Sequence, residues 1–226
     1  MNVIKEIITA DNILFMLRGA GASLLLAMGA VFFGTILGVI GASAKISKVK
    51  IFRVLGTIYV ELFRGTPMLL QILFFYLGVP VIYQSLTGDN LRVNPYMVGL
   101  LALSCNSGAY TTELIRSGII GIDKGQWEAC ETLGLNYSQT MRLVILPQAF
   151  KRVIPPLVSE FITLIKDSSL ISTIGATELL NTANVIGARY YNYLVPILCV
   201  SIMYLFITIT VSFVARKVER RFALYD

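Results

Sequence analysis

Apolar residues fall in long runs along the chain, and short polar stretches separate these runs. The clearest run covers residues 20–44 and is followed at once by Lys45, Lys48 and Lys50. A helix rises 1.5 Å per residue, so roughly 20 apolar residues cross the hydrocarbon core of a bilayer. The pattern therefore predicts an all-α integral membrane protein with five spans, at residues 20–44, 54–81, 95–116, 155–174 and 193–215.

Details within and between these runs predict local structure. Small residues recur every four positions in the first run, at Ala30, Gly34, Gly38 and Ala42. Such a ridge favours close packing against another helix of the same chain. The prolines at 155–156 suit a first helical turn and are expected to start the fourth span. After that span, Thr177 is expected to cap a short helix on the outer side.

Basic residues are distributed unequally between the two sides of the predicted spans. If the N-terminus is outside, the outer segments hold four basic residues, Lys5, Arg18, Arg92 and Arg189. The inner segments then hold thirteen, namely Lys45, Lys48, Lys50, Arg53, Arg116, Lys124, Arg142, Lys151, Arg152, Arg216, Lys217, Arg220 and Arg221. Because cytoplasmic loops of membrane proteins are enriched in lysine and arginine, the sequence predicts an N-out, C-in orientation.

The composition is typical of a membrane protein and argues against several kinds of binding and catalytic site. The chain has 14% charged and 56% hydrophobic residues, whereas a soluble domain carries about a quarter charged residues. The net charge of +6 does not indicate a nucleic-acid partner, because the basic residues lie beside the apolar runs. The sequence has no histidine and no phosphate-binding glycine loop. It therefore predicts no metal site, no cofactor and no catalytic residues.

A polar stretch between the third and fourth runs predicts a helical elbow in the cytoplasm. Residues 126–133 are expected to form a short helix, and Gly134 suits the left-handed position that ends it. Asn136 can cap a second helix, with Gln139 three positions on as the reciprocal capping residue. Pro147 is expected to bound this second helix. The elbow is therefore predicted to be rigid and to project from the membrane.

The elbow resembles the EAA loop of ATP-binding-cassette (ABC) importer permeases. The resemblance rests on Glu128-Ala129-Cys130, then Gly134, then Ile145-Leu146-Pro147. In that family the loop forms a coupling helix that docks on a cytoplasmic ATPase subunit. The resemblance implies a coupling role for Glu128, Ala129, Cys130 and Gly134, within a loop of about residues 118–152 in a single permease domain, residues 1–226. Cys130 stands where a second alanine is usual, but cysteine is also small and apolar, so packing should survive.

Further motifs resemble the permeases for polar amino acids of the histidine, glutamine and arginine type. They are the segments at residues 61–67, 109–118, 146–149 and 166–170. The resemblance implies a multi-pass subunit of the prokaryotic cytoplasmic membrane that imports polar amino acids, with basic ones as a further expectation. It also implies two ATPase subunits, a second permease that is identical or paralogous, and an extracytoplasmic amino acid-binding protein. The alternative is an ATP-independent channel or secondary transporter, but the five runs show no inverted repeat.

Polar residues inside the predicted spans indicate a substrate pathway. Asn106, Tyr110 and Glu113 share one helical stripe of the third span, and Glu160, Thr163 and Asp167 share one of the fourth. An amino acid needs an acceptor for its ammonium group and donors for its carboxylate. Glu113 or Asp167 could supply the first, and Ser168, Ser169 or free backbone amides the second.

Each of these carboxylates also has a structural interpretation. Glu113 is three residues from Arg116 and could form an ion pair with it near the inner interface. Asp167 follows Lys166, which could neutralise it locally. Because Lys166 is adjacent to Asp167, Glu113 is the favoured contact for the substrate ammonium. A similar pair, Glu61 and Arg64, is interpreted as structural rather than ligand-binding.

Overall fold

The computed structural model describes residues 2–223 and the side chains of residues 4–217. Over residues 2–223 the chain forms helices joined by short connections, and no strand is present. The helical fold class predicted from the sequence is therefore confirmed. In chain order the elements are α1 (Asn2–Ile7), α2 (Ala10–Ile46), α3 (Lys50–Arg64), α4 (Met68–Leu73), the π-helical turn η1 (Phe74–Gly78), α5 (Val79–Thr87), α6 (Pro95–Ile120), α7 (Lys124–Thr132), α8 (Tyr137–Thr140), the π-helical turn η2 (Met141–Ile145), α9 (Leu146–Asp167), the 3₁₀ segment η3 (Ser168–Ile174), α10 (Leu179–Tyr190) and α11 (Leu194–Ala223).

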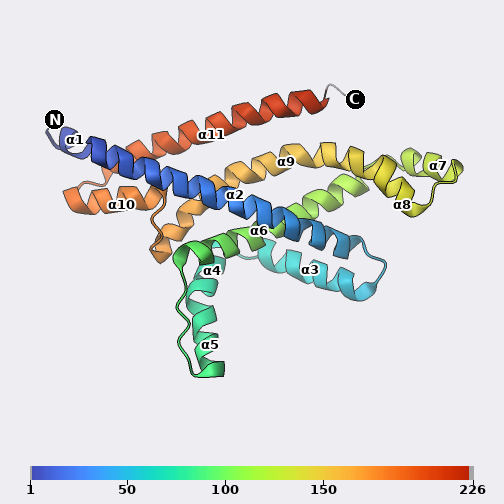
Figure 1. The fold of residues 1–226 in the computed structure, drawn as a ribbon, viewed down its shortest axis with the longest axis horizontal. Coiled ribbons are helices and arrows are strands. Elements are labelled where there is room, and N and C mark those ends of the chain that lie inside the picture. The colour runs from blue at the N-terminus through green and yellow to red at the C-terminus, as the bar shows by residue number, and fades with distance from the viewer. Residues whose placement is uncertain (1, 224–226) are drawn as a thin grey trace.

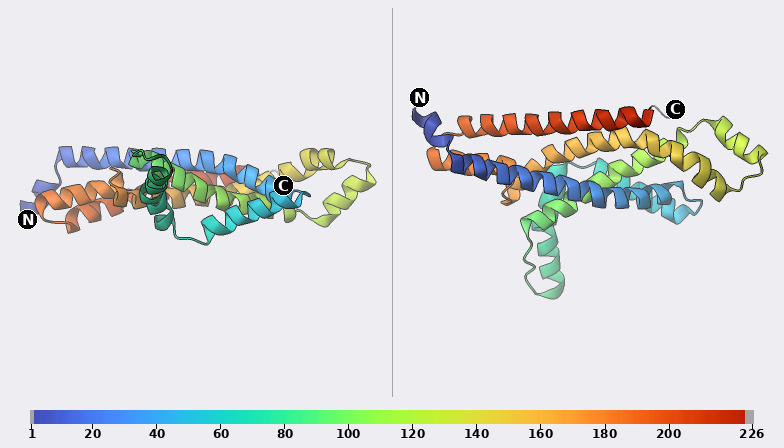
Figure 2. Two further views of the ribbon diagram at one scale, coloured as in Figure 1. Left: turned by 90° about the horizontal axis from the view of Figure 1, so that it is seen from below. Right: turned by 45° about the horizontal axis from the view of Figure 1, so that its top comes forward.

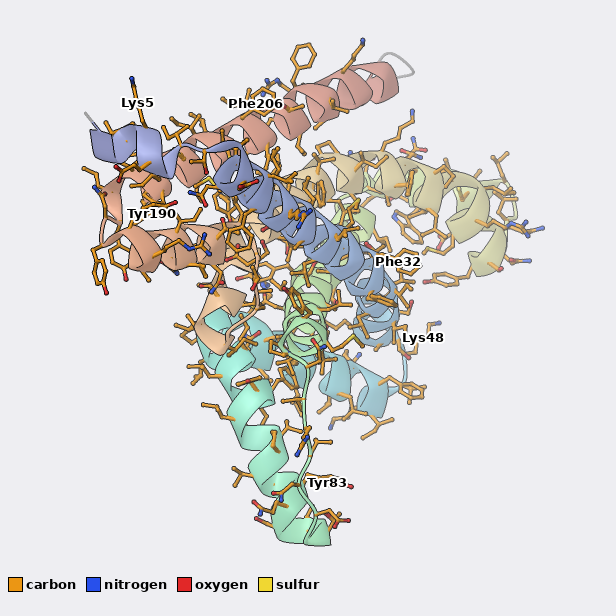
Figure 3. All side chains as sticks on the ribbon, turned by 60° about the vertical axis from the view of Figure 1, so that its left-hand side comes forward. Lys5, Phe32, Lys48, Tyr83, Tyr190 and Phe206 are labelled. Atoms are coloured by element: carbon orange, nitrogen blue, oxygen red, sulfur yellow. The ribbon has the colours of Figure 1, made fainter. Side chains whose placement is uncertain are left out.

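The molecule is elongated, and α2 runs along most of its length (Figure 1). With 37 residues, α2 is about 55 Å long at 1.5 Å per residue. The short helices α1 and α10 lie together at one end, whereas α7 and α8 form the opposite end (Figure 2). In Figure 3, Lys5 and Tyr190 mark the first of these ends, and Lys48 follows the far end of α2.

The ridge of small residues on α2 packs against α6, as the sequence predicts. A side chain at Gly34 would place its Cβ 2.8 Å from Ser107 Oγ, and one at Gly38 would collide with Thr111. Ala30 and Ala42 are buried on the same side of the helix. The ridge therefore brings two helix backbones of the same chain into close contact.

The second predicted span is not one helix, contrary to the expectation of a single helical region at residues 54–81. Helix α3 ends at Arg64, and a new helix begins after Pro67. Proline lacks a backbone N–H group and disfavours a helical conformation at the preceding Thr66, which explains the break. The arm formed by α4, η1 and α5 then leaves the bundle sideways, with Tyr83 near its tip (Figures 1 and 3).

Two amide side chains fasten this break to α6. Gln71 Nε2 donates to the backbone oxygens of Phe63 and Thr66, at 2.8 and 3.0 Å. Asn106 Nδ2 donates to Gln71 Oε1 at 3.0 Å and to Phe63 O at 3.2 Å. These bonds satisfy carbonyl groups that the end of α3 leaves free, so the amides fix the base of the arm.

Two predicted helix starts are also wrong. The prolines at 155–156 lie inside α9, because residues 146–154 are already helical and bury Ala149 and Val153 against neighbouring helices. Helix α10 is capped by Glu178 instead of Thr177: its carboxylate accepts from the backbone N–H groups of Leu180 and Asn181, at 2.9 and 2.7 Å. The N–H group and carbonyl of Thr177 instead bond the Tyr96 hydroxyl, each at 3.0 Å.

Three of the described helical stretches are long and apolar enough to cross a membrane. They are Ala10–Ile46, Met68–Thr87 and Leu194–Lys217. Helices α6 and α9 carry more polar residues. The many buried residues of α6 show that it lies inside the bundle.

Candidate functional site

The elbow formed by α7, Gly134 and α8 projects at one end of the molecule (Figure 2). Gly134 has a φ of 71°, the left-handed conformation that the sequence predicts for it. The N–H group of Gly134 donates to Glu131 O at 2.9 Å, and that of Leu135 donates to Cys130 O at 3.0 Å. This pair of bonds is a Schellman motif, which ends α7 and fixes the direction of the chain after it.

The second half of the elbow is capped as the sequence predicts. Asn136 Oδ1 accepts from the Gln139 backbone N–H group at 3.0 Å, and Gln139 Oε1 accepts from the Asn136 N–H group at 2.9 Å. The ring of Tyr137 stacks on that of Trp127, with centroids 6.4 Å apart. The stack joins the two arms of the elbow, so α7 and α8 are held at a fixed angle.

The helical path does not end at Pro147, contrary to expectation. The π-helical turn η2 leads directly into α9, and Pro147 lies in the first turn of that helix, where a missing N–H group costs little. Two bonds fasten the base of the elbow to α9. Gln148 Nε2 donates to Gln126 Oε1 at 3.2 Å, and the Arg152 guanidinium donates to Gly121 O. A force on the elbow would therefore reach α9 directly.

The residues of the EAA-like motif divide between surface and interior. Glu128 and Ala129 are exposed, whereas Cys130 is only 3% exposed and packs inward. Burial of Cys130 fits its replacement of a small alanine. Leu133 and Tyr137 are 77% and 62% exposed beside this motif. Exposed apolar side chains next to the exposed Glu128 carboxylate, on an elbow that projects from the bundle, are suited to contact with another protein.

The three α6 residues predicted for the substrate pathway make different contacts. Asn106 is buried and bonded to Gln71 at the base of the arm. Tyr110 is partly exposed, and the Arg64 guanidinium lies 5.1 Å from the centre of its ring. Arg64 therefore contacts Tyr110 and not Glu61, its expected partner. Glu113 binds two cations, Lys45 from α2 and Arg116 from its own helix.

The candidates near the end of α9 lie at the junction with η3. Asp167 and Ser169 are half-buried, and Ser168 is buried and donates to Ile165 O at 2.8 Å. Glu160 is also half-buried and Thr163 is exposed. Among the side chains that the structure describes, no hydrogen bond or ion pair joins these residues to Asn106, Tyr110 or Glu113. The geometry thus separates an α6 set from an α9 set.

Two contacts of the candidate residues could not be assigned from the sequence alone. Gln71 is a single polar residue within an apolar run, which was the only available signal for its role at the helix break. Lys45 belongs to the basic group after the first run, and nothing in that pattern distinguishes it from Lys48. Only the packing of α2 on α6 brings the Lys45 ammonium to Glu113.

The fold has the features of a membrane permease: apolar helices and a rigid elbow that projects at one end. Residues 22–224 match the family of binding-protein-dependent transport system inner membrane components, and the chain belongs to this family. It is a permease subunit of an ABC importer in the cytoplasmic membrane, and not itself an enzyme. The family implies a separate ATPase subunit and a substrate-binding protein.

The chain is similar to known proteins over nearly its whole length. It is 37% identical over 218 residues to the arginine transport system permease protein of Bacillus subtilis (strain 168), covering 96% of this chain and 97% of that one. It is 36% identical over 210 residues to a putative glutamine transport system permease protein of Rickettsia prowazekii (strain Madrid E), covering 93% and 94%. These relatives confirm the resemblance to amino acid permeases.

Solved structures share the fold. A chain in the crystal structure of an amino acid ABC transporter with histidines has a TM-score of 0.85 and 36% sequence identity, covering 92% of this chain and 94% of that one. A chain of a methionine ABC transporter in an inward-facing conformation has a TM-score of 0.74 over 95% of this chain and 99% of that one. At 18% identity, the second likeness shows the fold alone.

Proposed function

We propose that this permease imports polar amino acids by alternating access, driven by two ATPase subunits that dock on its elbow. The observation that carries the proposal is the rigid projection around Gly134, with Glu128 and Ala129 exposed on it. Such a projection converts closure of an ATPase dimer into movement of α9, because Gln148 ties α9 to Gln126 of α7 and Arg152 ties it to Gly121, just before α7.

The proposed topology has five spans with the N-terminus outside. The spans are α2, the α3–α5 region, α6, α9 with η3, and α11. Helices α6 and α9 need not be as apolar as α2, because neighbouring helices cover much of their surface. The basic residues Lys48, Lys50 and Arg53 lie at the end of α2 and the start of α3, which this orientation places at the inner interface.

A second permease, identical or paralogous, is proposed to face the polar residues that this chain exposes at membrane depth. Arg64, Tyr110 and Thr163 are partly or fully exposed. A charge such as Arg64 is costly in lipid, so a protein partner or a water-filled cavity must cover it. A route for a polar substrate between two permeases would satisfy this requirement.

The proposed substrate is a polar amino acid, with basic ones favoured. Relatives are named for arginine and glutamine, which supports the class of substrate. Of the six residues predicted to bind it, Tyr110, Asp167 and Ser169 keep side chains that are not enclosed. The other three already form hydrogen bonds or ion pairs with residues of this chain: Asn106, Glu113 and Ser168. These contacts favour a role in positioning the helices rather than in binding substrate. We place the ammonium of the substrate at Asp167, with Glu160 about two turns earlier on the same helical stripe.

The experiment is affinity purification of the tagged chain from its native membranes, followed by reconstitution with the proteins that accompany it. An ATPase and a second permease should copurify, and ATP hydrolysis should rise with an arginine- or glutamine-type substrate and its binding protein. Purification without an ATPase, together with uptake that does not depend on ATP, would contradict the proposal and favour a channel or secondary transporter.

A further inference from the structure

A long apolar groove separates the second half of α2 from α8, η2 and α9. Its volume is about 810 Å³, and its walls include Thr35, Val39 and Ile46 on one side and Tyr137, Phe150 and Leu157 on the other. Among the side chains described, at residues 4–217, Lys48 is the one charged group that lines it. No residue of the predicted substrate site lines this groove, so it is a separate feature of the fold.

The length of the groove matches one leaflet of a bilayer. Thr35 and Ile46 are eleven positions apart on α2, which corresponds to roughly 16 Å at 1.5 Å per residue. Half of a hydrocarbon core of about 30 Å is roughly 15 Å. The charged side chain lies beyond one end of this stretch, where Lys48 extends from the end of α2 (Figure 3).

The volume of the groove suits a single small molecule. At about 810 Å³ it lies within the range of about 300–1,000 Å³ that is typical of such sites. Water is also a poor occupant, because most of the wall is hydrocarbon and offers few hydrogen-bonding partners.

We propose that the groove binds an anionic phospholipid of the inner leaflet, with an acyl chain along α2 and the headgroup at Lys48. The assignment to the inner leaflet rests on the proposed orientation; the assignment of the lipid rests on the shape and charge of the groove. Basic residues at the cytoplasmic mouth of a site between membrane helices favour anionic headgroups over zwitterionic ones.

The position of this lipid connects it to the elbow. Tyr137 lines the groove, and its ring stacks on Trp127 of α7. Met141 and Ala149 also line it and pack in the apolar cluster that joins α6, the elbow and α9. A bound acyl chain therefore fills the space between α2 and the base of the elbow, and supports the angle at which the elbow projects.

Trp127 is the one tryptophan of this chain, so its fluorescence can report on the groove. The transporter is placed in nanodiscs of phosphatidylcholine with increasing phosphatidylglycerol whose acyl chains are brominated. Subtracting the signal of the Trp127→Phe variant isolates this residue from any tryptophan of the partner subunits. Quenching should saturate at a low mole fraction of brominated phosphatidylglycerol, whereas brominated phosphatidylcholine should quench weakly.

Matched variants then test the two ends of the site. Lys48→Gln should raise the half-saturating mole fraction about fivefold, the effect expected for one basic residue, whereas Lys50→Gln should change it much less. Val39→Phe, which fills the groove from an exposed position, should reduce the quenching, and Ile40→Phe on another face of α2 should not. Equal quenching by the two lipids, or equal shifts in Lys48→Gln and Lys50→Gln, would overturn the proposal, even if transport itself were intact.

Discussion

The Lys45 ammonium donates a hydrogen bond to the Glu113 carboxylate, and this contact joins the C-terminal end of α2 to the C-terminal half of α6. Arg116 Nε donates to the other oxygen of Glu113 at 2.9 Å. The carboxylate is therefore already matched by two cations. A substrate ammonium at this position would be a third, which favours a structural role for Glu113 and leaves Asp167 as the proposed substrate contact.

Glu113→Gln tests the structural role directly. The substitution removes two charge-assisted hydrogen bonds and leaves Lys45, whose side chain is 13% exposed, without its counter-ion. We expect the free energy of unfolding to fall by about 1.5–3 kcal/mol, measured by thermal or denaturant unfolding of the purified protein. The double variant Lys45→Met/Glu113→Gln should recover part of this loss. Unchanged stability with a raised KM for uptake would instead assign Glu113 to the substrate.

Asp167→Asn should act on transport. It keeps the shape of the side chain and removes the negative charge that we assign to the substrate ammonium, so KM for a basic amino acid should rise about tenfold, equivalent to about 1.4 kcal/mol. Glu61→Gln is the matched control, because Glu61 is an exposed carboxylate in another proposed span. Equal KM values for wild type and Asp167→Asn, measured by uptake into proteoliposomes, would remove Asp167 from the site.

The orientation can be checked with single cysteines in a background from which Cys105, Cys130 and Cys199 have been replaced. Asp89 lies at the tip of the arm and Lys48 after α2, and both side chains are exposed. A membrane-impermeant thiol reagent added to intact cells should label Asp89→Cys and not Lys48→Cys. The reverse pattern would place the elbow on the side away from any cytoplasmic ATPase.

Much of the fold follows from the sequence, because long apolar runs and strong local signals determine it. The ridge of Gly34 and Gly38, the left-handed Gly134 and the Asn136 capping box are confirmed. The errors arise where contacts between residues far apart in the sequence determine where a helix starts or ends. Tertiary packing keeps the helix intact through Pro155, and the break before Pro67 turns the arm out of the bundle.

The candidate site was harder to predict for the same reason. Helical spacing correctly placed Asn106, Tyr110 and Glu113 on one helix, but spacing does not reveal what faces them. Gln71 reaches Asn106 across 35 positions of sequence, and Lys45 reaches Glu113 across 68. Such pairs depend on how the helices pack, which a single sequence does not encode locally.

The buried carboxyl of Glu178 predicts a dependence of stability on pH. Burial raises the pKa of Glu178 above its usual value, although Tyr204, Ser23 and two backbone N–H groups donate to it. A group whose pKa is raised on folding favours the folded state at low pH, so its contribution is lost as pH rises from the usual glutamate pKa towards the higher folded value.

The variant Glu178→Gln isolates this contribution. The Tm of the wild type minus the Tm of the variant should decrease as pH rises from about 4.5 towards neutrality. The reason is that only the wild type can ionise at this position. Glu61→Gln, at an exposed carboxylate, serves as the control variant. A parallel pair of Tm curves for wild type and Glu178→Gln would show that Glu178 is ionised normally in the folded protein.

The central claim is that the elbow transmits ATP hydrolysis to the transport pathway, and two glycines allow a matched test. Gly134 and Gly88 both have positive φ, 71° and 81°, and at neither residue would an added Cβ have a neighbouring atom within 4 Å. Valine at either position is strained by a similar amount, about 1–2 kcal/mol, but only Gly134 shapes the elbow. The deciding measurement is the number of ATP molecules hydrolysed per amino acid imported by reconstituted transporters. Gly134→Val should raise this ratio severalfold while Gly88→Val leaves it unchanged, and a normal ratio in Gly134→Val would contradict the account.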